Sequence, residues 1–181
     1  MINLLEHPNG LRFANLYVYS KSLQQSKYVR LQNILASIPG ITYRSYSEND
    51  DVVRPEETKP YSVIVFDDVA CDKQNLMKMY FSTARHFGVD VFYLCQTYTH
   101  LPKHLLRDNA NFIILFRQDG GNLKHVYDDH VNTDMSFDVF KDLCVQCWNG
   151  NRYGFLVIDK DSELHNGRYR KGFDEYFDTR G

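Results

Sequence analysis

Short apolar runs alternate along the chain with longer segments in which apolar residues recur every three or four positions. The short runs predict buried strands, and the longer segments predict amphipathic helices. The clearest helical segment ends at Gly88, a residue type that commonly closes a helix, and its apolar face carries Leu76, Met77, Tyr80, Phe81, Ala84 and Phe87. Strands that alternate with helices predict an α/β fold with a mainly parallel sheet flanked by helices.

The positions of the elements follow from the same pattern. We expect strands at residues 14–19, 41–46, 62–66, 89–95, 112–116 and 153–158, and helices that end near residue 6 or cover residues 22–38, 72–87, 102–107, 122–129 and 136–148. Ser22 and Gln25 match a capping box, and Asp72 is the expected N-cap of the helix after the third strand. Residues 47–60 are acidic and interrupted by prolines, which indicates a surface loop, and residues 159–181 are expected to form a polar tail.

Chain length and composition indicate one domain over residues 1–181, with a substantial core because 43% of the residues are hydrophobic. The net charge of −2 gives no basic footprint for nucleic acid over the whole chain, although a ring-shaped motor can concentrate basic residues in its pore. Lys21, Lys27, Arg30 and the basic residues at 168–171 are candidate contacts to DNA phosphates, with solvated surface charge as the simpler interpretation. Without a long apolar span or an evident secretory leader, we expect an intracellular protein that is not secreted and has no membrane partner.

Three polar side chains stand where two neighbouring strands are expected to end. Asp67 and Asp68 follow the apolar run at 62–66, and Gln96 follows the run at 89–95. Because the carboxyl ends of parallel strands share one edge of a sheet, we expect these side chains to lie close together. Carboxylates suit Mg²⁺, and a glutamine can align a water molecule beside a γ-phosphate. The structural alternatives are an aspartate that caps the next helix and a glutamine that hydrogen-bonds a loop.

The residues from Val63 to Gln96 resemble the additional-strand branch of P-loop ATPases, in which one strand lies between the phosphate-loop strand and the acidic strand. Within that branch, the phrase QTYTHLPKHLLRDNANFIILF, together with ANLYVYSKSLQQSKY and FSTARHFGVDV, is similar to the viral DNA-packaging ATPases of the FtsK/HerA superfamily. These include the poxvirus-type enzyme and its relatives in Polinton-like and adintovirus-like elements. The resemblance covers residues 4–116, with weaker support beyond.

This resemblance implies a role for each polar residue. Asp67 would be the magnesium-side carboxylate, Asp68 would orient or deprotonate the attacking water, and Gln96 would sense the γ-phosphate. Arg85 is the candidate arginine finger or subunit contact, with Arg107 as second choice. The alternative for either arginine is a favourable interaction with the end of a helix.

The resemblance also implies ATP and Mg²⁺ as cofactors and a homo-oligomeric ring that pumps double-stranded DNA into a capsid. Capsid or portal-like proteins would be partners, and the infected host cell would be the location, with virion association as a further expectation. The alternatives are another FtsK/HerA-like DNA translocase and a catalytically inactive, degenerate or integrated remnant that acts as an interaction module.

One part of that pattern is missing. The phosphate loop G-x-x-x-x-G-K-[ST], whose backbone amides and lysine hold the β- and γ-phosphates, does not occur in the sequence. In this branch its strand lies between the strand that ends at Gln96 and the strand at 112–116, so its absence leaves unpaired strand edges. MINLLEHP resembles the end of the helix after the loop, so we expect residue 1 to lie just downstream of a missing segment, in an N-terminally truncated ATPase domain. We expect this chain alone neither to bind ATP tightly nor to hydrolyse it.

The cysteines offer a different candidate site. Cys144 and Cys147 form a single C-x-x-C, and with His125 and His130 they could bind zinc. Both cysteines fall on the apolar face of a predicted helix, however, so buried free thiols are the favoured interpretation.

Overall fold

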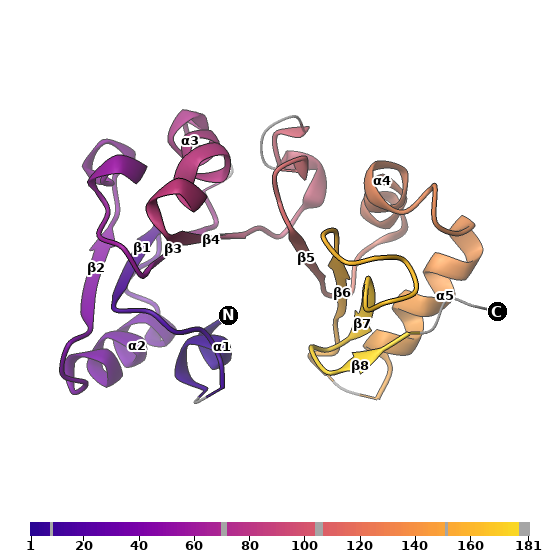
Figure 1. Ribbon diagram of the computed structural model, residues 1–181, viewed down its shortest axis with the longest axis horizontal. Helices are drawn as coiled ribbons and strands as arrows, with labels where there is room; N and C mark the ends of the chain where they lie inside the picture. The colour runs from indigo at the N-terminus through magenta and orange to yellow at the C-terminus, as the bar shows by residue number, and fades with distance from the viewer. Residues whose placement is uncertain (8, 70–71, 104–106, 151, 178–181) are drawn as a thin grey trace. The chain divides into compact units, whose positions relative to one another are not determined.

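The computed structural model describes residues 1–7, 9–69, 72–103, 107–150 and 152–177 (Figure 1). The chain falls into two compact units, each with its own sheet. Unit 1 contains Met1–Gln96 and Leu101–Asn109, and unit 2 contains Thr97–His100 and Ala110–Gly181. The expected single ATPase domain over residues 1–181 stays a prediction.

Unit 1 is built on a four-stranded parallel sheet with the strand order β2-β1-β3-β4. Its strands are β1 (Asn15–Ser20), β2 (Thr42–Tyr46), β3 (Ser62–Asp67) and β4 (Val89–Leu94). Its helices are α1 (Ile2–Glu6), α2 (Ser26–Ala36) and α3 (Asn75–Thr83). All residues of β1 and β3 are buried, as expected for the central strands of a parallel sheet covered on both faces. The predicted α/β fold is therefore confirmed.

Alternating side chains of the two central strands feed two separate hydrophobic cores. On one face, Tyr19 and Phe66 pack with Met77 and Tyr80 of α3. On the other face, the alternate residues of β1 and β3 pack with Leu5 of α1 and with α2. Figure 1 shows the result within unit 1, with α3 on one side of the sheet and α1 and α2 on the other.

Two predicted helix starts are wrong. Ser22 is not an N-cap, because α2 begins at Ser26 after Gln25, and the backbone N–H of Ser22 instead donates to Ser20 Oγ at 3.1 Å. Asp72 is not an N-cap either, because its carboxylate accepts the hydroxyl of Tyr19 and α3 begins only at Asn75. At Asp72 the polar side chain has a tertiary partner that competes with the local helix cap.

The end of the third predicted helix agrees with the expectation. After α3 the chain continues as a short 3₁₀ helix, η3 (Ala84–Phe87), and turns at Gly88 with φ +66°. That left-handed backbone conformation is one that glycine adopts without steric strain.

Unit 2 is built on an antiparallel sheet, which the sequence pattern did not predict. Its strands, in the order β5-β6-β7-β8, are β5 (Phe112–Leu115), β6 (Leu156–Asp159), β7 (Tyr169–Lys171) and β8 (Glu175–Tyr176). Its helices are α4 (Gly120–His130) and α5 (Phe137–Trp148). Asp119 caps α4 by accepting the backbone N–H groups of Gly121 and Asn122, and Ser136 caps α5.

Several segments expected to be irregular contain short regular elements. The surface loop at 47–60 includes the 3₁₀ turns η1 (Asn49–Asp51) and η2 (Pro55–Glu57) and buries Val52. The polar tail at 159–181 contributes β7 and β8, because Tyr169 is fully buried and holds the segment against β6. A further 3₁₀ turn, η4 (Tyr98–His100), precedes the helix expected at 102–107, of which residues 104–106 lie outside the described residues.

Each sheet has an open edge, and the two edge strands concerned, β4 and β5, are consecutive in the chain. Among the described residues, β4 pairs only with β3, and β5 pairs only with β6. These are the two strands that were expected to lack a neighbour. No helix in the described part of the chain is long and apolar enough to span a membrane.

Candidate functional site

The carboxyl edge of the parallel sheet in unit 1 brings together three of the predicted site residues, Asp67, Asp68 and Gln96. Ser20 at the end of β1 pairs in register with Asp67 at the end of β3, and Asp67 pairs with Leu94 at the end of β4. The residues that follow each strand therefore emerge at the same edge, where ligands of open parallel sheets commonly bind.

Asp67 lies at the centre of this edge, with its side chain held by the first turn of α2. Its Oδ2 atom accepts hydrogen bonds from Lys27 Nζ, at 2.8 Å, and from the hydroxyl of Tyr28. In the part of the chain that the structure describes, no donor is placed on its other oxygen, Oδ1. Burial, and then the hydrogen bond to Asp67, raises the pKa of the Tyr28 phenol far above its ordinary value, so Tyr28 acts as a permanent donor.

Asp68 and Gln96 are brought together as predicted. The amide Nε2 of Gln96 donates to Asp68 Oδ2 at 3.3 Å, and both side chains are exposed. Asp68 has a left-handed backbone with φ +56°, and its N–H donates to the carbonyl of Leu94 at 3.1 Å. A non-glycine residue in this conformation is strained, and such strain is commonly found at functional sites.

A second polar network lies beside the first. The hydroxyl of Tyr19 donates to Asp72, and Lys21 Nζ lies 3.1 Å from Glu48 and 3.8 Å from Asp72. This network links the end of β1 to the segments that follow β2 and β3. Asp72 therefore has a tyrosine hydroxyl and a lysine on one oxygen, as Asp67 has, but its lysine lies farther away and also pairs with Glu48.

The two candidate arginines lie at different places. Arg85 is exposed in η3, which directly precedes β4, so Arg85 lies at the amino edge of the sheet, about 20 Å from the carboxyl edge across a strand of this length. Arg107 is half-buried and donates from Nε to the carbonyl of Leu101 at 3.1 Å. Burial, and then the charge of Asp68, raises the pKa of Cys95 to about 11, and Arg107 opposes this effect. Arg107 is therefore nearer to the Asp68 end of the sheet than Arg85.

Comparison with known proteins gives the family. The family model described as Poxvirus A32 protein matches residues 27–174, which is more than half of the chain. The chain belongs to the Poxvirus A32 protein family. The match includes α2 from Lys27 onward as well as Asp67, Asp68 and Gln96. A search of curated proteins found no match.

Several solved structures that are similar to this Poxvirus A32 family chain carry the name B204. The crystal structure of B204, the DNA-packaging ATPase from Sulfolobus turreted icosahedral virus, has a TM-score of 0.56 and 16% identity over 82% of this chain and 78% of that chain. The genome-packaging NTPase B204 from Sulfolobus turreted icosahedral virus 2 in complex with ATP-gammaS has a TM-score of 0.56 and 14% identity over 88% and 82%. Its complex with AMP has a TM-score of 0.51 and 15% identity over 81% and 77%. At these identities the likeness concerns the fold.

The donor set at the edge fits Mg²⁺ in the way that nucleotide enzymes bind it. Mg²⁺ commonly takes one or two carboxylates and fills its other positions with water and phosphate oxygens. Oδ1 of Asp67 carries no donor among the described residues, and the carboxylate of Asp68 is exposed at the same edge. The described residues contain no group of three or more acidic, histidine or cysteine side chains that could hold a metal by themselves. The protein's share of such a site is therefore one or two carboxylates.

The cysteine and histidine cluster is dispersed in this Poxvirus A32 family chain. Cys144 and Cys147 are buried free thiols on the inner face of α5, as favoured by the sequence. Burial raises the pKa of Cys147 to about 11 and that of Cys144 further. His125 is exposed, whereas His130 is buried with its Nε2 atom 2.6 Å from the hydroxyl of Tyr98.

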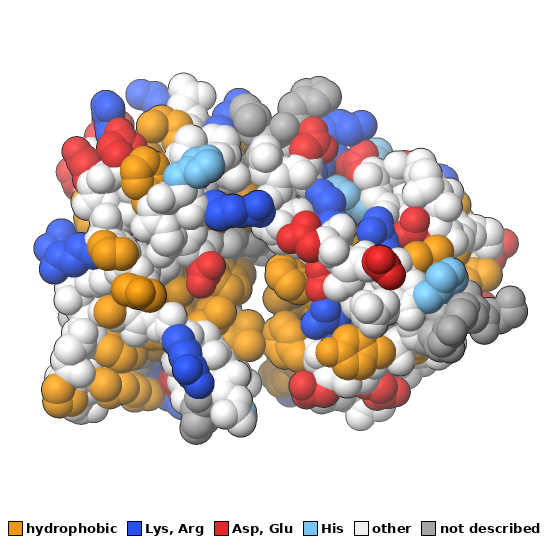
Figure 2. Space-filling model, viewed as in Figure 1, with side chains coloured by type: hydrophobic (Ala, Val, Ile, Leu, Met, Phe, Trp, Pro, Cys, Tyr) orange, Lys and Arg blue, Asp and Glu red, His pale blue; other side chains and the backbone are white. Residues whose placement is uncertain are grey.

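The basic residues near the carboxyl terminus are paired within unit 2. Arg168 Nε lies 2.6 Å from Asp134, Arg170 pairs with Asp159, and Lys171 Nζ lies 3.2 Å from Glu175. Acidic and basic side chains are mixed on the face shown in Figure 2, in keeping with the net charge of −2. Contacts from residues 168–171 to DNA phosphates would therefore require these ion pairs to open.

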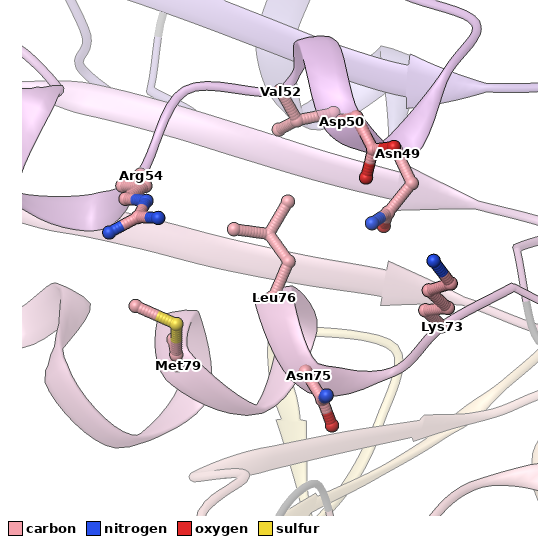
Figure 3. A pocket seen from close by; sticks show the side chains of 8 residues that line it. All are labelled: Asn49, Asp50, Val52, Arg54, Lys73, Asn75, Leu76 and Met79. Carbon is pink, nitrogen blue, oxygen red and sulfur yellow. The ribbon is translucent and has the colours of Figure 1, made fainter.

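A cavity of about 360 Å³ lies in unit 1 between α3 and the segment after β2 (Figure 3). Leu76 points from α3 toward Val52, and Arg54 and Lys73 lie at opposite ends of the cavity. None of the predicted site residues lines it.

The sequence pattern does not predict the two residues that hold Asp67. Lys27 was considered only as a surface contact to DNA, and Tyr28 was not singled out. Both residues follow β1, which the structure places next to the acidic strand β3. The strand order is not known from the sequence, so the contact between the first turn of this helix and Asp67 could not be predicted.

Proposed function

We propose that this chain forms part of a viral genome-packaging ATPase that couples ATP hydrolysis to the movement of double-stranded DNA into a capsid. The proposal rests on one observation above the others, the meeting of Asp68 and Gln96 beside Asp67 at the carboxyl edge of a parallel sheet. Membership of the Poxvirus A32 protein family and the fold shared with the packaging ATPase B204 support it.

Each residue has a role that follows from its position. Asp67, nearly buried, serves the metal through Oδ1 while Lys27 and Tyr28 hold Oδ2. Asp68 and Gln96 are both exposed, and together they can orient a water molecule between a carboxylate and an amide. A bound Mg²⁺ would supply positive charge to neutralise phosphate oxygens in the transition state.

In our proposal, Arg85 completes the site of a neighbouring subunit and not the site of its own subunit. Arg85 lies at the far edge of the sheet from Asp67, so within one subunit it is too distant to reach the same phosphate. In a homo-oligomeric ring it could act on the site of a neighbouring subunit. Arg107 is the alternative for a role within the same subunit.

The test has two stages, because the sequence has no phosphate loop. The genomic DNA upstream of residue 1 is sequenced first, for an in-frame strand and G-x-x-x-x-G-K-[ST]. ATP hydrolysis is then measured on the chain extended by that segment. We expect Asp68→Asn and Gln96→Ala each to lower kcat by roughly a hundredfold or more with little change in ATP affinity, because they act on the attacking water.

Asp72→Asn is the matched control, since Asp72 is a carboxylate at the same edge whose partners are Tyr19 and Lys21. An extended protein whose kcat falls equally in all three variants would contradict the assigned roles. For the 181-residue chain alone we expect no ATP affinity in the micromolar range, and tight binding by this chain would overturn that expectation.

The extended protein and the upstream DNA sequence also distinguish genome packaging from two other functions. A general FtsK/HerA-like DNA translocase would show DNA-stimulated ATP hydrolysis that does not respond to empty capsids, whereas a packaging enzyme would respond to them. If no phosphate loop is encoded upstream, the chain is a remnant or an interaction module, an interpretation favoured by the absence of the loop from the sequence.

A further inference from the structure

The first turn of α2 provides two donors to Asp67. Lys27 and Tyr28 are adjacent in sequence, and their polar atoms converge on the same carboxylate oxygen. Lys27 Nζ also lies 4.8 Å from the centre of the Tyr28 ring, within the range of a cation–π interaction. The carboxylate thus has a positively charged neighbour that belongs to the protein.

The two donors differ in how firmly they are held. Tyr28 is 1% exposed and lies in the core under α2, so its hydroxyl cannot leave Asp67 without disturbing the packing. The side chain of Lys27 is 40% exposed, while that of Asp67 is 12% exposed. Lys27 can therefore swing into solvent, and Tyr28 would keep the carboxylate in place when it does so.

Lys27 also lies so close to Asp67 that its positive charge must affect a metal ion bound there. A divalent cation bound to Asp67 would lie within roughly 5 Å of an ammonium group that contacts the same carboxylate, and like charges at that distance repel one another even in water. Unlike Lys27, Lys21 at the same edge pairs with Glu48 and Asp72. The two lysines are thus a matched pair that differ in which carboxylate they neutralise.

We propose that Lys27 is a resident counter-ion of Asp67, which a divalent cation must displace before it binds there. This inference rests on the proposed function only in taking Asp67 as the metal-side carboxylate. It assigns to Lys27 a positioning role that limits metal binding while the ammonium group occupies the carboxylate. Displacement leaves the ammonium group at the same edge, where it can pair with an anion such as a phosphate group.

The experiment uses Mn²⁺ as the probe on the 181-residue chain. Binding is followed by paramagnetic broadening of the backbone amide signals of Asp67, Asp68 and Val69. We expect Lys27→Met to bring half-maximal broadening to an Mn²⁺ concentration about tenfold lower than in the unmodified chain, the order of magnitude for removing one like charge at this distance. Lys27→Arg, which keeps the charge, should resemble the unmodified chain, and Lys21→Met should leave the midpoint unchanged.

The outcomes separate this inference from the proposed function. Broadening that disappears in Asp67→Asn but does not change in Lys27→Met overturns the counter-ion role and leaves Asp67 as the metal-side carboxylate. Broadening that persists in Asp67→Asn places the metal elsewhere and overturns both. A weaker affinity in Lys27→Met than in the unmodified chain also overturns the inference, because the ammonium group would then assist metal binding.

A change of fold is controlled in two ways. The amide spectrum of each variant must retain the dispersed signals of β1 and β3, the two central strands. Lys27→Gln serves as a second neutral variant that keeps hydrogen-bonding capacity, and it should shift the midpoint in the same direction as Lys27→Met. Opposite shifts in the two neutral variants would overturn the inference.

Discussion

Asp67 in unit 1 and Asp159 in unit 2 are both the last residue of a strand, and both are nearly buried, at 9% and 5% exposed. Their oxygens are used differently. Asp159 Oδ1 accepts the N–H of Asp161 at 3.1 Å, and Oδ2 accepts the hydroxyl of Ser162 at 2.8 Å and the guanidinium of Arg170. Asp67 has its donors on Oδ2, and none of the described residues donates to Oδ1. Asp159 is thus satisfied on both oxygens, whereas Asp67 has one oxygen without a donor among the described residues.

The difference follows from the two sheets. Asp159 ends a strand of an antiparallel sheet, and two of its donors lie within three residues of it in the sequence. Asp67 ends a strand of a parallel sheet, and its donors come from a helix that follows a different strand. Local donors surround a carboxylate readily, while donors from one helix reach it from one side only.

The largest effect that would sharpen this comparison is on the stability of unit 2. Asp159→Ala should lower the free energy of unfolding by about 2–4 kcal/mol, because Arg170 loses its counter-charge and two further donors lose their acceptor. Urea unfolding is followed by the fluorescence of Trp148, the only tryptophan, whose indole N–H donates to the carbonyl of Leu115 within unit 2.

The matching change in unit 1 is Asp67→Asn, and its effect on unfolding is measured by circular dichroism. The amide oxygen can still accept from Tyr28, and the pair with Lys27 is partly exposed, so we expect a loss of no more than about 1 kcal/mol. Equal losses for Asp159→Ala and Asp67→Asn would mean that both carboxylates are structural, and the contrast between them would fail.

A smaller effect concerns the backbone of Asp68. Its φ of +56° is tolerated by asparagine better than by alanine, so Asp68→Ala should be less stable than Asp68→Asn by about 1 kcal/mol. Because the side chain is exposed, loss of the carboxylate by itself should change stability little. Thermal unfolding of the two variants and of Asp68→Gly measures the contribution of the backbone, because glycine has no Cβ. Equal stability of all three variants would argue against backbone strain.

The smallest effect expected at neutral pH is on thiol reactivity. Burial raises the pKa of Cys95 and Cys147 from 9.0 to about 11, so at pH 8 iodoacetamide should modify neither in the folded protein while it modifies both in urea. The folded state holds these protons more tightly, so the stability that they contribute is present below pH 9 and is lost as the pH rises through 11. When the pH is raised toward 11, Cys95, which is half-buried, should react before the fully buried Cys144, as mass spectrometry of the modified peptides would show.

Hydrophobic patterning was sufficient to predict the strands of unit 1, because each central strand is a continuous apolar run that ends in a polar residue. It also predicted that Asp68 and Gln96 meet, since parallel strands place their ends together. It could not predict that β5 belongs to an antiparallel sheet, because an apolar run does not indicate the direction of its partner. The contacts of Lys27 and Tyr28 with Asp67 depend on strand order and on how α2 packs, which no local pattern encodes.

The left-handed backbone at Asp68 restricts how this position can change over generations. Asparagine, glycine and glutamate are among the residues that a single-nucleotide change of an aspartate codon can give. Asparagine and glycine suit the backbone but remove the carboxylate, while glutamate keeps the acid and moves it on a longer side chain that is less suited to a positive φ. Lineages in which asparagine or glycine replaces this aspartate should therefore persist as well-folded proteins, and an intact fold among relatives would be no guide to whether their edge still carries a carboxylate.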